Sequence, residues 1–491
     1  MNHAMIGRIS RRTLAGLSLV ALTGCANLAP DYERPAPVTP QLWPSVGAYG
    51  APEPVTATDV ADLGWRDFFV DAGLRHTVAL ALAHNRDLRV AALNIEAARA
   101  QYHDTRSNLF PSVDASGSAT FSRAGRTSGR DDTASGNLAN QSSVSRSLSA
   151  ELGFASYEID FFGRLRNQRE AALNTLLSSA ASRRATQISL IGEVATRWLT
   201  LAADQSRLAL ARQTLANQRD NLKLVQARHD YGVASGSDVA NARSAVESAR
   251  VDVASLTTTI AQDRNALNRI AGTVVPASAL PGAELPEDAV RQKLPAGIPS
   301  RVLVNRPDVI AAEYTLRGDY ASIGAARAAF FPRISLTAAT GWATSGLSGL
   351  FADDNRSWSV TPAMDVPIFD GGSRAAQLDL AHVQRDIDLA DYESTLQTAF
   401  REVADALAIR ATIDDQIDAQ TRLVTANARA YRLSLARYRA GTDSYQDTLV
   451  EQRALYSARQ NEIDRRLARQ TNLVTLYKVL GGGGLAESAG P

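Results

Sequence analysis

The chain has 491 residues, and its 52 Lys and Arg residues against 51 Asp and Glu leave a net charge of +1 at pH 7. That balance gives no electrostatic basis for binding nucleic acid. A single cysteine excludes an intrachain disulfide, and the six histidines lack the HxxxH and HExxH spacings of common zinc sites. Because the chain also lacks a P-loop and a GxSxG motif, we expect neither an enzyme nor a metal centre.

Residues 1–24 have the pattern of a secretory signal peptide. A basic start precedes an apolar run over 14–22 that is too short to span a membrane. The run ends in Leu-Thr-Gly-Cys25, which resembles the lipobox of bacterial lipoproteins. The resemblance implies cleavage before Cys25 and attachment of N-acyl and S-diacylglycerol lipid to it; no cofactor is expected. The adjacent Arg11 and Arg12 leave a twin-arginine signal as the less favoured alternative.

The chain contains an internal duplication. Apolar residues recur at a spacing of seven over 194–222, and the same register returns 209 residues later over 403–431. The register has one break, at Arg410, and its ten positions are Val194, Leu201, Leu208, Leu215 and Leu222, then Val403, Arg410, Ile417, Val424 and Tyr431. A sustained period of seven is typical of helices packed as a coiled coil, so two homologous halves are predicted.

The duplication predicts the domain organisation. The mature chain begins with an extended, proline-rich lead segment, because proline fixes φ and removes a hydrogen-bond donor. A linker separates the two repeats, and the chain ends in a glycine-rich tail. The expected ranges are 25–64 for the lead, 65–272 for the first repeat, 273–304 for the linker, 305–480 for the second repeat and 481–491 for the tail.

Each half contains a long helix, a glycine and a returning helix. The predicted helices are 163–231 and 233–272 in the first half, then 371–440 and 442–480 in the second. Gly232 and Gly441 lie where the periodic pattern reverses, and glycine tolerates the left-handed conformation of such a turn. At 1.5 Å per residue the first long helix would extend roughly 100 Å.

Before each long helix, apolar and small polar residues alternate with a period of two. These stretches, 110–121, 147–162, 332–343 and 357–369, match the weak signature of outer-membrane barrel strands. Four strands cannot close a barrel, and an open edge cannot lie in lipid, so several chains must share one barrel. Charge facing lipid is costly, so Glu158, Asp160 and Asp365 should face a lumen or lie at strand ends.

Several motifs then resemble those of one family. They are Pro30-Asp-Tyr32, Trp65-Arg-Asp-Phe-Phe69, Tyr157-Glu-Ile-Asp-Phe-Phe-Gly-Arg164, the stretch from Leu294 to Asp308, and Pro367-Ile-Phe-Asp-Gly-Gly372. In this order they resemble the outer membrane factor family of TolC relatives, and more narrowly its NodT/OprM-type lipoprotein branch. The resemblance implies a mixed α/β membrane protein. It would be a homotrimer with a 12-stranded outer-membrane β-barrel, four strands per chain, above a long periplasmic α-helical coiled-coil barrel.

The same resemblance implies a function. Such proteins are exit channels of tripartite efflux pumps, joined to a periplasmic adaptor and an inner-membrane pump, usually of the resistance–nodulation–division class. They passively conduct drugs or other small toxic compounds across the outer membrane. Two alternatives remain: the exit duct of a type I secretion system, and a lipid-anchored structural coiled coil without a pore.

The resemblance also assigns roles to the helix–turn–helix tips. In the family these tips meet the adaptor, which implies docking at Gly232, Val233, Gly441 and Thr442. They also close the periplasmic entrance.

Tyr438, Asp447 and Arg453 match positions of the family's periplasmic gate, and three copies of Asp447 would form an acidic ring. A second family carboxylate matches Val450, with Glu451 beside it. Asp443, Asp447 and Glu451, spaced by four, should share one helix face, and a solvated face paired with Arg453 is the alternative.

Overall fold

The computed structural model describes residues 27–44, 46–49, 63–123, 144–292 and 300–482. The signal peptide, Cys25 and most of the glycine-rich tail lie outside these residues. No helix in the described ranges is long and apolar enough to cross a membrane.

The chain divides into two structural units, each assembled from three stretches of sequence. The strand unit comprises Met1–Arg34, Ala97–Leu176 and Tyr314–Leu389. The hairpin unit comprises Pro35–Glu96, Leu177–Glu313 and Ala390–Pro491. The long helices contribute to both units, because the division falls within them.

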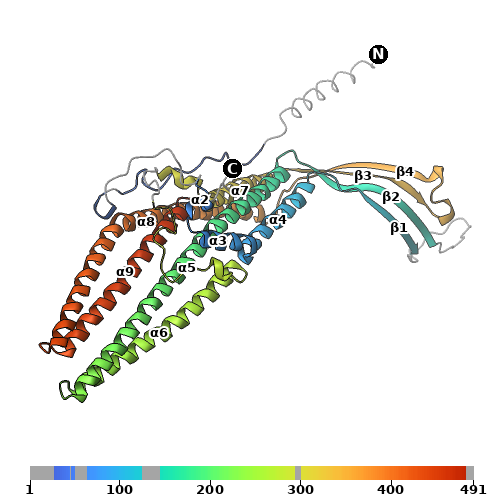
Figure 1. Cartoon of the computed structure of the whole chain (residues 1–491). Helices are drawn as coiled ribbons and strands as arrows, with labels where there is room; N and C mark the ends of the chain where they lie inside the picture. Colours follow the sequence, from blue (N-terminus) through green and yellow to red (C-terminus); the bar gives the residue numbers. More distant parts are fainter. Residues whose placement is uncertain (1–26, 45, 50–62, 124–143, 293–299, 483–491) are drawn as a thin grey trace, which may run out of the picture. The chain divides into compact units, whose positions relative to one another are not determined.

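The strand unit contains a four-stranded antiparallel sheet in the order β1-β2-β3-β4 (Figure 1). The strands are β1 (Asp114–Arg123), β2 (Val144–Ile159), β3 (Arg333–Thr344) and β4 (Arg356–Asp365). The central pair β2–β3 joins the two repeats, with Glu151 opposite Gly341. A side chain at Gly341 would overlap the Ala150 carbonyl, so this glycine permits the close approach of the two strands. β1 and β4 are the outer strands, and among the described residues each leaves one edge unpaired.

Each strand is continuous in sequence with a helix. α4 (Arg86–Ser107) leads to β1, and β2 leads to α5 (Arg164–Asp230). In the second repeat α7 (Pro307–Ala328) leads to β3, and β4 leads to α8 (Ser373–Ala440). Glu158, Asp160 and Asp365 lie at these junctions, as the cost of charge in lipid predicts, whereas Glu151 lies within β2. Glu158 is near the end of β2, Asp160 follows it and accepts from the Arg166 N–H at 2.9 Å, and Asp365 ends β4.

Several boundaries differ from those expected from the sequence. β1 begins at Asp114 instead of residue 110, because Pro111 offers no N–H to a strand ladder. β4 ends at Asp365 instead of residue 369. The returning helices α6 (Gly236–Ala271) and α9 (Tyr445–Val479) each begin three residues later than expected, because each turn extends to a capping serine.

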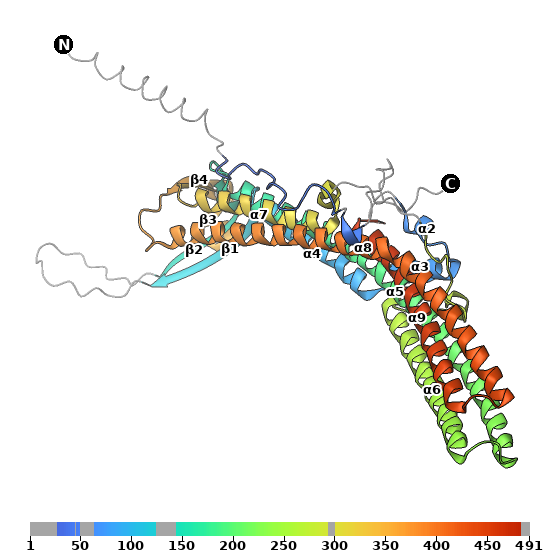
Figure 2. The ribbon, with the colours of Figure 1, turned by 90° about the vertical axis from the view of Figure 1, so that its left-hand side faces the viewer.

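In the hairpin unit, α5 and α6 form one antiparallel hairpin and α8 and α9 form the other, with both turns at the same end (Figures 1 and 2). The heptad positions of the first half are packed: Val194 and Leu201 are fully buried, and Leu208 and Leu215 nearly so. In the second half only Val403 is fully buried, and the four later positions are half-exposed in the single chain. The heptad positions of the two halves therefore differ in burial, although their registers match.

The main core of the hairpin unit lies away from the turns, where short helices pack on the long ones. α2 (Trp65–Phe68) and α3 (Ala72–His84) contribute to it. The Phe68 ring stacks on Tyr477 with centroids 4.1 Å apart, and the Trp198 indole N–H donates to the Ala279 carbonyl at 2.9 Å. Five short 3-10 helices complete the described elements: Gly47–Tyr49, Ala277–Ala279, Ser300–Asn305, Leu347–Gly349 and Asp353–Asn355.

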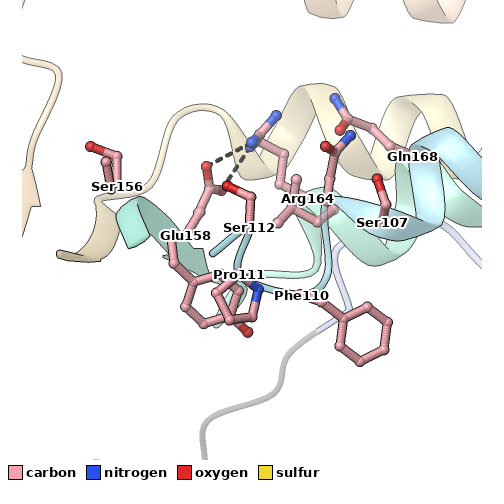
Figure 3. Close-up of a pocket in the computed structure, with 12 residues that line it drawn as sticks. Ser107, Phe110, Pro111, Ser112, Ser156, Glu158, Arg164 and Gln168 are labelled. Atoms are coloured by element: carbon pink, nitrogen blue, oxygen red, sulfur yellow. Dashed lines mark hydrogen bonds and ion pairs between the residues drawn. The ribbon is translucent and has the colours of Figure 1, made fainter. Parts of the chain in front are cut away.

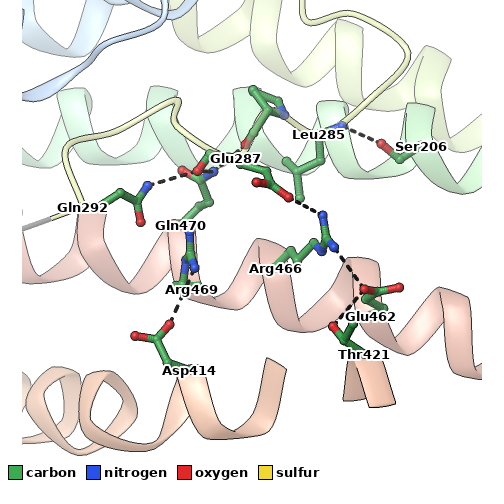
Figure 4. A network of polar contacts seen from close by, with 11 residues as sticks. Ser206, Leu285, Glu287, Gln292, Asp414, Thr421, Glu462, Arg466, Arg469 and Gln470 are labelled. Carbon is green, nitrogen blue, oxygen red and sulfur yellow. Dashed lines mark hydrogen bonds and ion pairs between the residues drawn. The ribbon is translucent and has the colours of Figure 1, made fainter. Parts of the chain in front are cut away.

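Polar contacts fix the inter-repeat linker to α5 and α9 (Figure 4). The Leu285 N–H donates to the Ser206 hydroxyl at 2.7 Å, and the Arg466 guanidinium bridges Glu287 at 2.6 Å and Glu462 at 3.0 Å. The Gln470 side chain donates to the Glu287 carbonyl at 2.8 Å. The linker therefore ties a helix of the first repeat to a helix of the second.

Candidate gate and docking site at the hairpin tips

The first tip is a glycine turn followed by a capped helix. Gly232 has φ +72°, which is a left-handed conformation, and the Val233 N–H donates to the Arg228 carbonyl at 2.8 Å. Ser235 then caps α6: its hydroxyl accepts from the Asp238 N–H at 3.1 Å, and the Asp238 carboxylate accepts from the Ser235 N–H at 3.0 Å. This reciprocal capping box satisfies two donors that the helix itself leaves unpaired.

The second tip repeats this geometry 209 residues later. Gly441 has φ +80°, and the Thr442 N–H and hydroxyl both donate to the Arg437 carbonyl at 3.0 Å. Ser444 caps α9, accepting from the Asp447 N–H at 3.3 Å and donating its hydroxyl to the Asp447 carboxylate at 2.7 Å. Asp447 is thus the counterpart of Asp238, and its local contacts are those of a capping carboxylate.

The prediction that Asp443, Asp447 and Glu451 share one helix face is wrong. Asp443 precedes the capping residue Ser444, so it lies in the turn and not on α9. There its carboxylate pairs with the Arg437 guanidinium at 3.2 Å. Within α9, Asp447, Val450 and Arg453 are exposed in the single chain, whereas Glu451 is half-buried. Glu451 therefore does not occupy the face on which Val450 lies.

The two tips pack against each other through a small aromatic cluster. Val225 and Ala242 of the first hairpin contact Tyr438, Tyr445 and Leu449 of the second. The Tyr438 and Tyr445 rings lie 5.4 Å apart, and both side chains are almost completely buried. The tips of one chain therefore form a single body.

Arg228 is a polar link between the two hairpin tips. Its guanidinium lies 4.7 Å from the centre of the Tyr438 ring, and its Nη1 donates to the Arg439 carbonyl at 3.3 Å. Sequence reasoning did not assign Arg228 to the site. The one signal was its repeat position, since its counterpart Arg437 directly precedes Tyr438, where the expected gate segment begins.

Burial controls the electrostatics of the cluster. It raises the pKa of Tyr438, although the Arg228 cation acts in the opposite direction. It raises the pKa of Tyr445 to about 12, with smaller contributions from Tyr431 and Tyr438, while Arg453 lowers it. Both tyrosines are therefore neutral donors, and neither hydroxyl has a hydrogen-bond partner among the described residues. A buried donor without a partner is costly, so the contact between the two tips is less stable than its apolar residues suggest.

Sheet and tips together define a class of protein. A four-stranded sheet with two unpaired edges leads, through helices of 67 and 68 residues, to paired hairpin tips. This is the organisation of a channel subunit, which needs further copies to close its sheet.

The family is shown by sequence. The profile described as "Outer membrane efflux protein" matches residues 77–273 and 298–482, and the chain belongs to that family. The two matched stretches correspond to the two halves of the duplication.

Individual relatives cover nearly the whole chain. A toluene efflux pump outer membrane protein, TtgC of Pseudomonas putida, is 44% identical over 477 residues, 96% of each chain. The cation efflux system protein CusC of Escherichia coli is 38% identical over 94% of this chain and 97% of its own. The open-state crystal structure of the MtrE outer membrane channel of Neisseria gonorrhoeae has a TM-score of 0.82 at 35% identity, over 93% of this chain and 98% of that one.

These likenesses confirm the expected fold class, the outer-membrane location with a periplasmic extension, and the absence of enzymatic activity. The chain is an outer-membrane channel of an efflux pump. The alternative of a structural coiled coil without a pore is therefore wrong, because the strand pairs that opposed it belong to a channel fold.

Proposed function

We propose that three copies of this chain form the exit duct of a tripartite pump of the resistance–nodulation–division class. The duct passively conducts drugs or other small toxic compounds from a periplasmic adaptor and an inner-membrane pump to the exterior. The observation that carries the proposal is the sheet with two unpaired edges, which cannot lie in lipid unless neighbouring copies pair with both. The full-length likeness to a toluene efflux pump protein supports small molecules as the transported class.

The proposal includes lipidation of Cys25. The described chain begins two residues later, and its first residues contact α7 in the strand unit. The Arg327 guanidinium donates to the Leu28 carbonyl at 3.3 Å, and a side chain at Gly324 would come within 2.7 Å of Ala29 Cα. These contacts lie near the end of α7, a few residues before β3 begins at Arg333. Three residues reach at most about 10 Å, so lipid on Cys25 would enter the membrane beside the junction of helix and strand.

At the tips, Asp447 is the proposed gate residue. Its carboxylate is exposed in the single chain although it caps α9. Three copies around an axis form an acidic ring, in which bound cations hold the closed entrance together and repulsion favours opening. Tyr438 and Arg453 support this ring from the same segment. Val450, on the same exposed face, places an apolar collar where the family carries a second carboxylate.

Docking of the adaptor is proposed at the turn residues. Val233 is 64% exposed and its neighbour Tyr231 is 85% exposed, so the first tip presents an apolar surface suited to a protein partner. Gly232, Gly441 and Thr442 hold the backbone of the two turns that display it.

The gate proposal is tested by a matched pair of variants. Asp447→Asn and Asp238→Asn each weaken a serine cap at the same helix position, so both should lower stability by a similar amount. Only Asp447→Asn should raise the conductance of the closed channel severalfold in planar bilayers, because only it removes charge from the ring. Equal conductance of the two variants would refute the gate role. Drug susceptibility of cells that express each variant then reports on transport.

A further inference from the structure

A cavity of about 540 Å³ lies at the junction of helices and strands in the strand unit (Figure 3). It is lined by the segment that precedes β1 (residues 107–112), the C-terminal part of β2 (residues 155–158) and the first residues of α5. Phe110 and Pro111 supply apolar surface, and Glu158 and Arg164 supply charge. The cavity is therefore part apolar and part polar, and one of its walls is the segment that leads into β1, an outer strand of the sheet.

The cavity is built into the fold by an irregularity of β2. The register of β2 against β3 shifts between Phe154 and Tyr157, and Ser156 has φ +52°, a left-handed conformation rare for a residue with a side chain. The Ser156 N–H donates to the Thr337 hydroxyl at 3.0 Å, and the Tyr157 hydroxyl donates to the Leu109 carbonyl at 3.2 Å. Strand, bulge and the segment before β1 thus hold one another in place.

The opposite edge of the sheet presents two apolar side chains without cover. Ile368 and Phe369, between β4 and α8, are 94% and 91% exposed, the highest values among the large apolar residues of the described chain. Their segment is anchored: Asp370 accepts from the Gly372 and Arg374 N–H groups, each at 3.0 Å, at the start of α8. An ordered pair of exposed large apolar side chains marks an interaction surface.

Strand directions bring these two features together in a closed barrel. β1 leaves the cavity end of the sheet, because Asp114 follows directly after the lining residues, and β4 returns to that end at Asp365. A cyclic barrel of identical chains pairs β1 of one copy with β4 of the next, antiparallel. Residues 366–372 of one copy then lie beside residues 107–113 of its neighbour.

We propose that Ile368 and Phe369 of each chain insert into this cavity of the neighbouring chain and secure the boundary between copies. The inference rests on the shared barrel of the proposed assembly. A phospholipid headgroup is the competing occupant. Glu158 and Arg164 disfavour it, because they already neutralise each other through two hydrogen bonds of 2.9 and 2.6 Å and leave no net charge for a phosphate. A phenylalanine side chain buries 150–250 Å² of surface, which a part-apolar cavity accommodates.

Photo-crosslinking of the full chain in outer membranes tests the occupant. p-Benzoylphenylalanine in place of Phe369 should give covalent multimers, whose adduct maps to residues 107–112 or 155–168 of the neighbouring chain. An adduct with phospholipid, or with any other segment, would overturn the proposal. The same probe in place of Leu347, an exposed residue of the β3–β4 connection at the other end of the sheet, is the control and should not label those segments.

A second measurement uses trimer stability. Phe369→Ala should weaken each interface between copies about thirtyfold, the effect expected of an interface anchor, and so lower the ratio of trimer to monomer in denaturing detergent. Pro111→Trp, which fills the cavity from the other side, should do the same, whereas Leu347→Ala should not. If the wild-type chain forms trimers and neither variant lowers their stability, only the docking is refuted. Failure of the wild-type chain to form trimers would refute the shared barrel itself.

Discussion

Removal of the Arg228 side chain should loosen the hairpin tips. Arg228→Ala deletes a cation–π contact with Tyr438 at 4.7 Å and a charged hydrogen bond to the Arg439 carbonyl at 3.3 Å. The first contributes about 0.5–2 kcal/mol and the second about 1.5–3 kcal/mol. Because Arg228 is half-buried and its hydrogen bond is long, we expect about 2 kcal/mol, near the lower end of the sum.

The chain supplies a matched control. Arg437 is the counterpart of Arg228 in the second repeat, but its side chain is 67% exposed and it pairs with Asp443 at 3.2 Å. An exposed ion pair contributes about 0–1 kcal/mol, so Arg437→Ala should change little.

Amide hydrogen exchange and single-channel conductance together check the reasoning. In Arg228→Ala, amides of the two tips should exchange about thirtyfold faster, and the channel should open more often. Arg437→Ala should resemble the wild type in both measurements. If the two variants exchange at equal rates, Arg228 does not hold the hairpins together.

Three further predictions concern separate parts of the chain. Burial, with the neighbouring Asp204, raises the pKa of Asp263 to about 6 from 3.8, so its charged form destabilises the fold above that pH. Thermal unfolding should show stability rising by about 1–2 kcal/mol as pH falls from 7 towards 4, after allowance for partial exposure, and Asp263→Asn should remove this contribution. Gly324→Ala places a methyl group 2.7 Å from Ala29 Cα, and this overpacking, about 1–3 kcal/mol, should release the lead segment to limited proteolysis; equal digestion of wild type and variant would contradict it. Val450→Asp adds a carboxylate to the exposed face of α9 and should increase the cation selectivity of the conductance; unchanged reversal potentials in a salt gradient would exclude Val450 from the pore.

Local pattern predicted most of the architecture. A period of seven identified the long helices, a period of two identified the strands, and Gly232 and Gly441 marked the turns with positive φ. The order of elements therefore follows from residues close together in the chain. The lengths of the turns were missed, although Ser444, three residues before Asp447, has the spacing of a helix cap.

Long-range contacts could not be predicted in this way. Arg228 and Tyr438 are 210 residues apart, and their contact depends on how two hairpins pack, which no local period specifies. The cavity beside β1 depends on a left-handed serine, a residue type that seldom signals such a turn. The exposure of Ile368 and Phe369 is also a property of the folded sheet. In the sequence they belong to a family motif whose pattern does not show whether they are covered.

The position of the β2–β3 pair has a consequence for assembly. This pair joins the two repeats in the middle of one sheet, so each repeat supplies two adjacent strands and one hairpin. A single-repeat ancestor with two strands would need six copies to build the same twelve-stranded barrel, with six identical tips around the entrance. Joining two repeats in one chain halves the number of copies and frees the tips to differ. His229 stands where the second repeat has Tyr438, and Gly236 stands where it has Tyr445. In a barrel of three such chains the entrance carries three pairs of unequal hairpins, and alternate tips around the ring can specialise in closing the entrance or in meeting a partner.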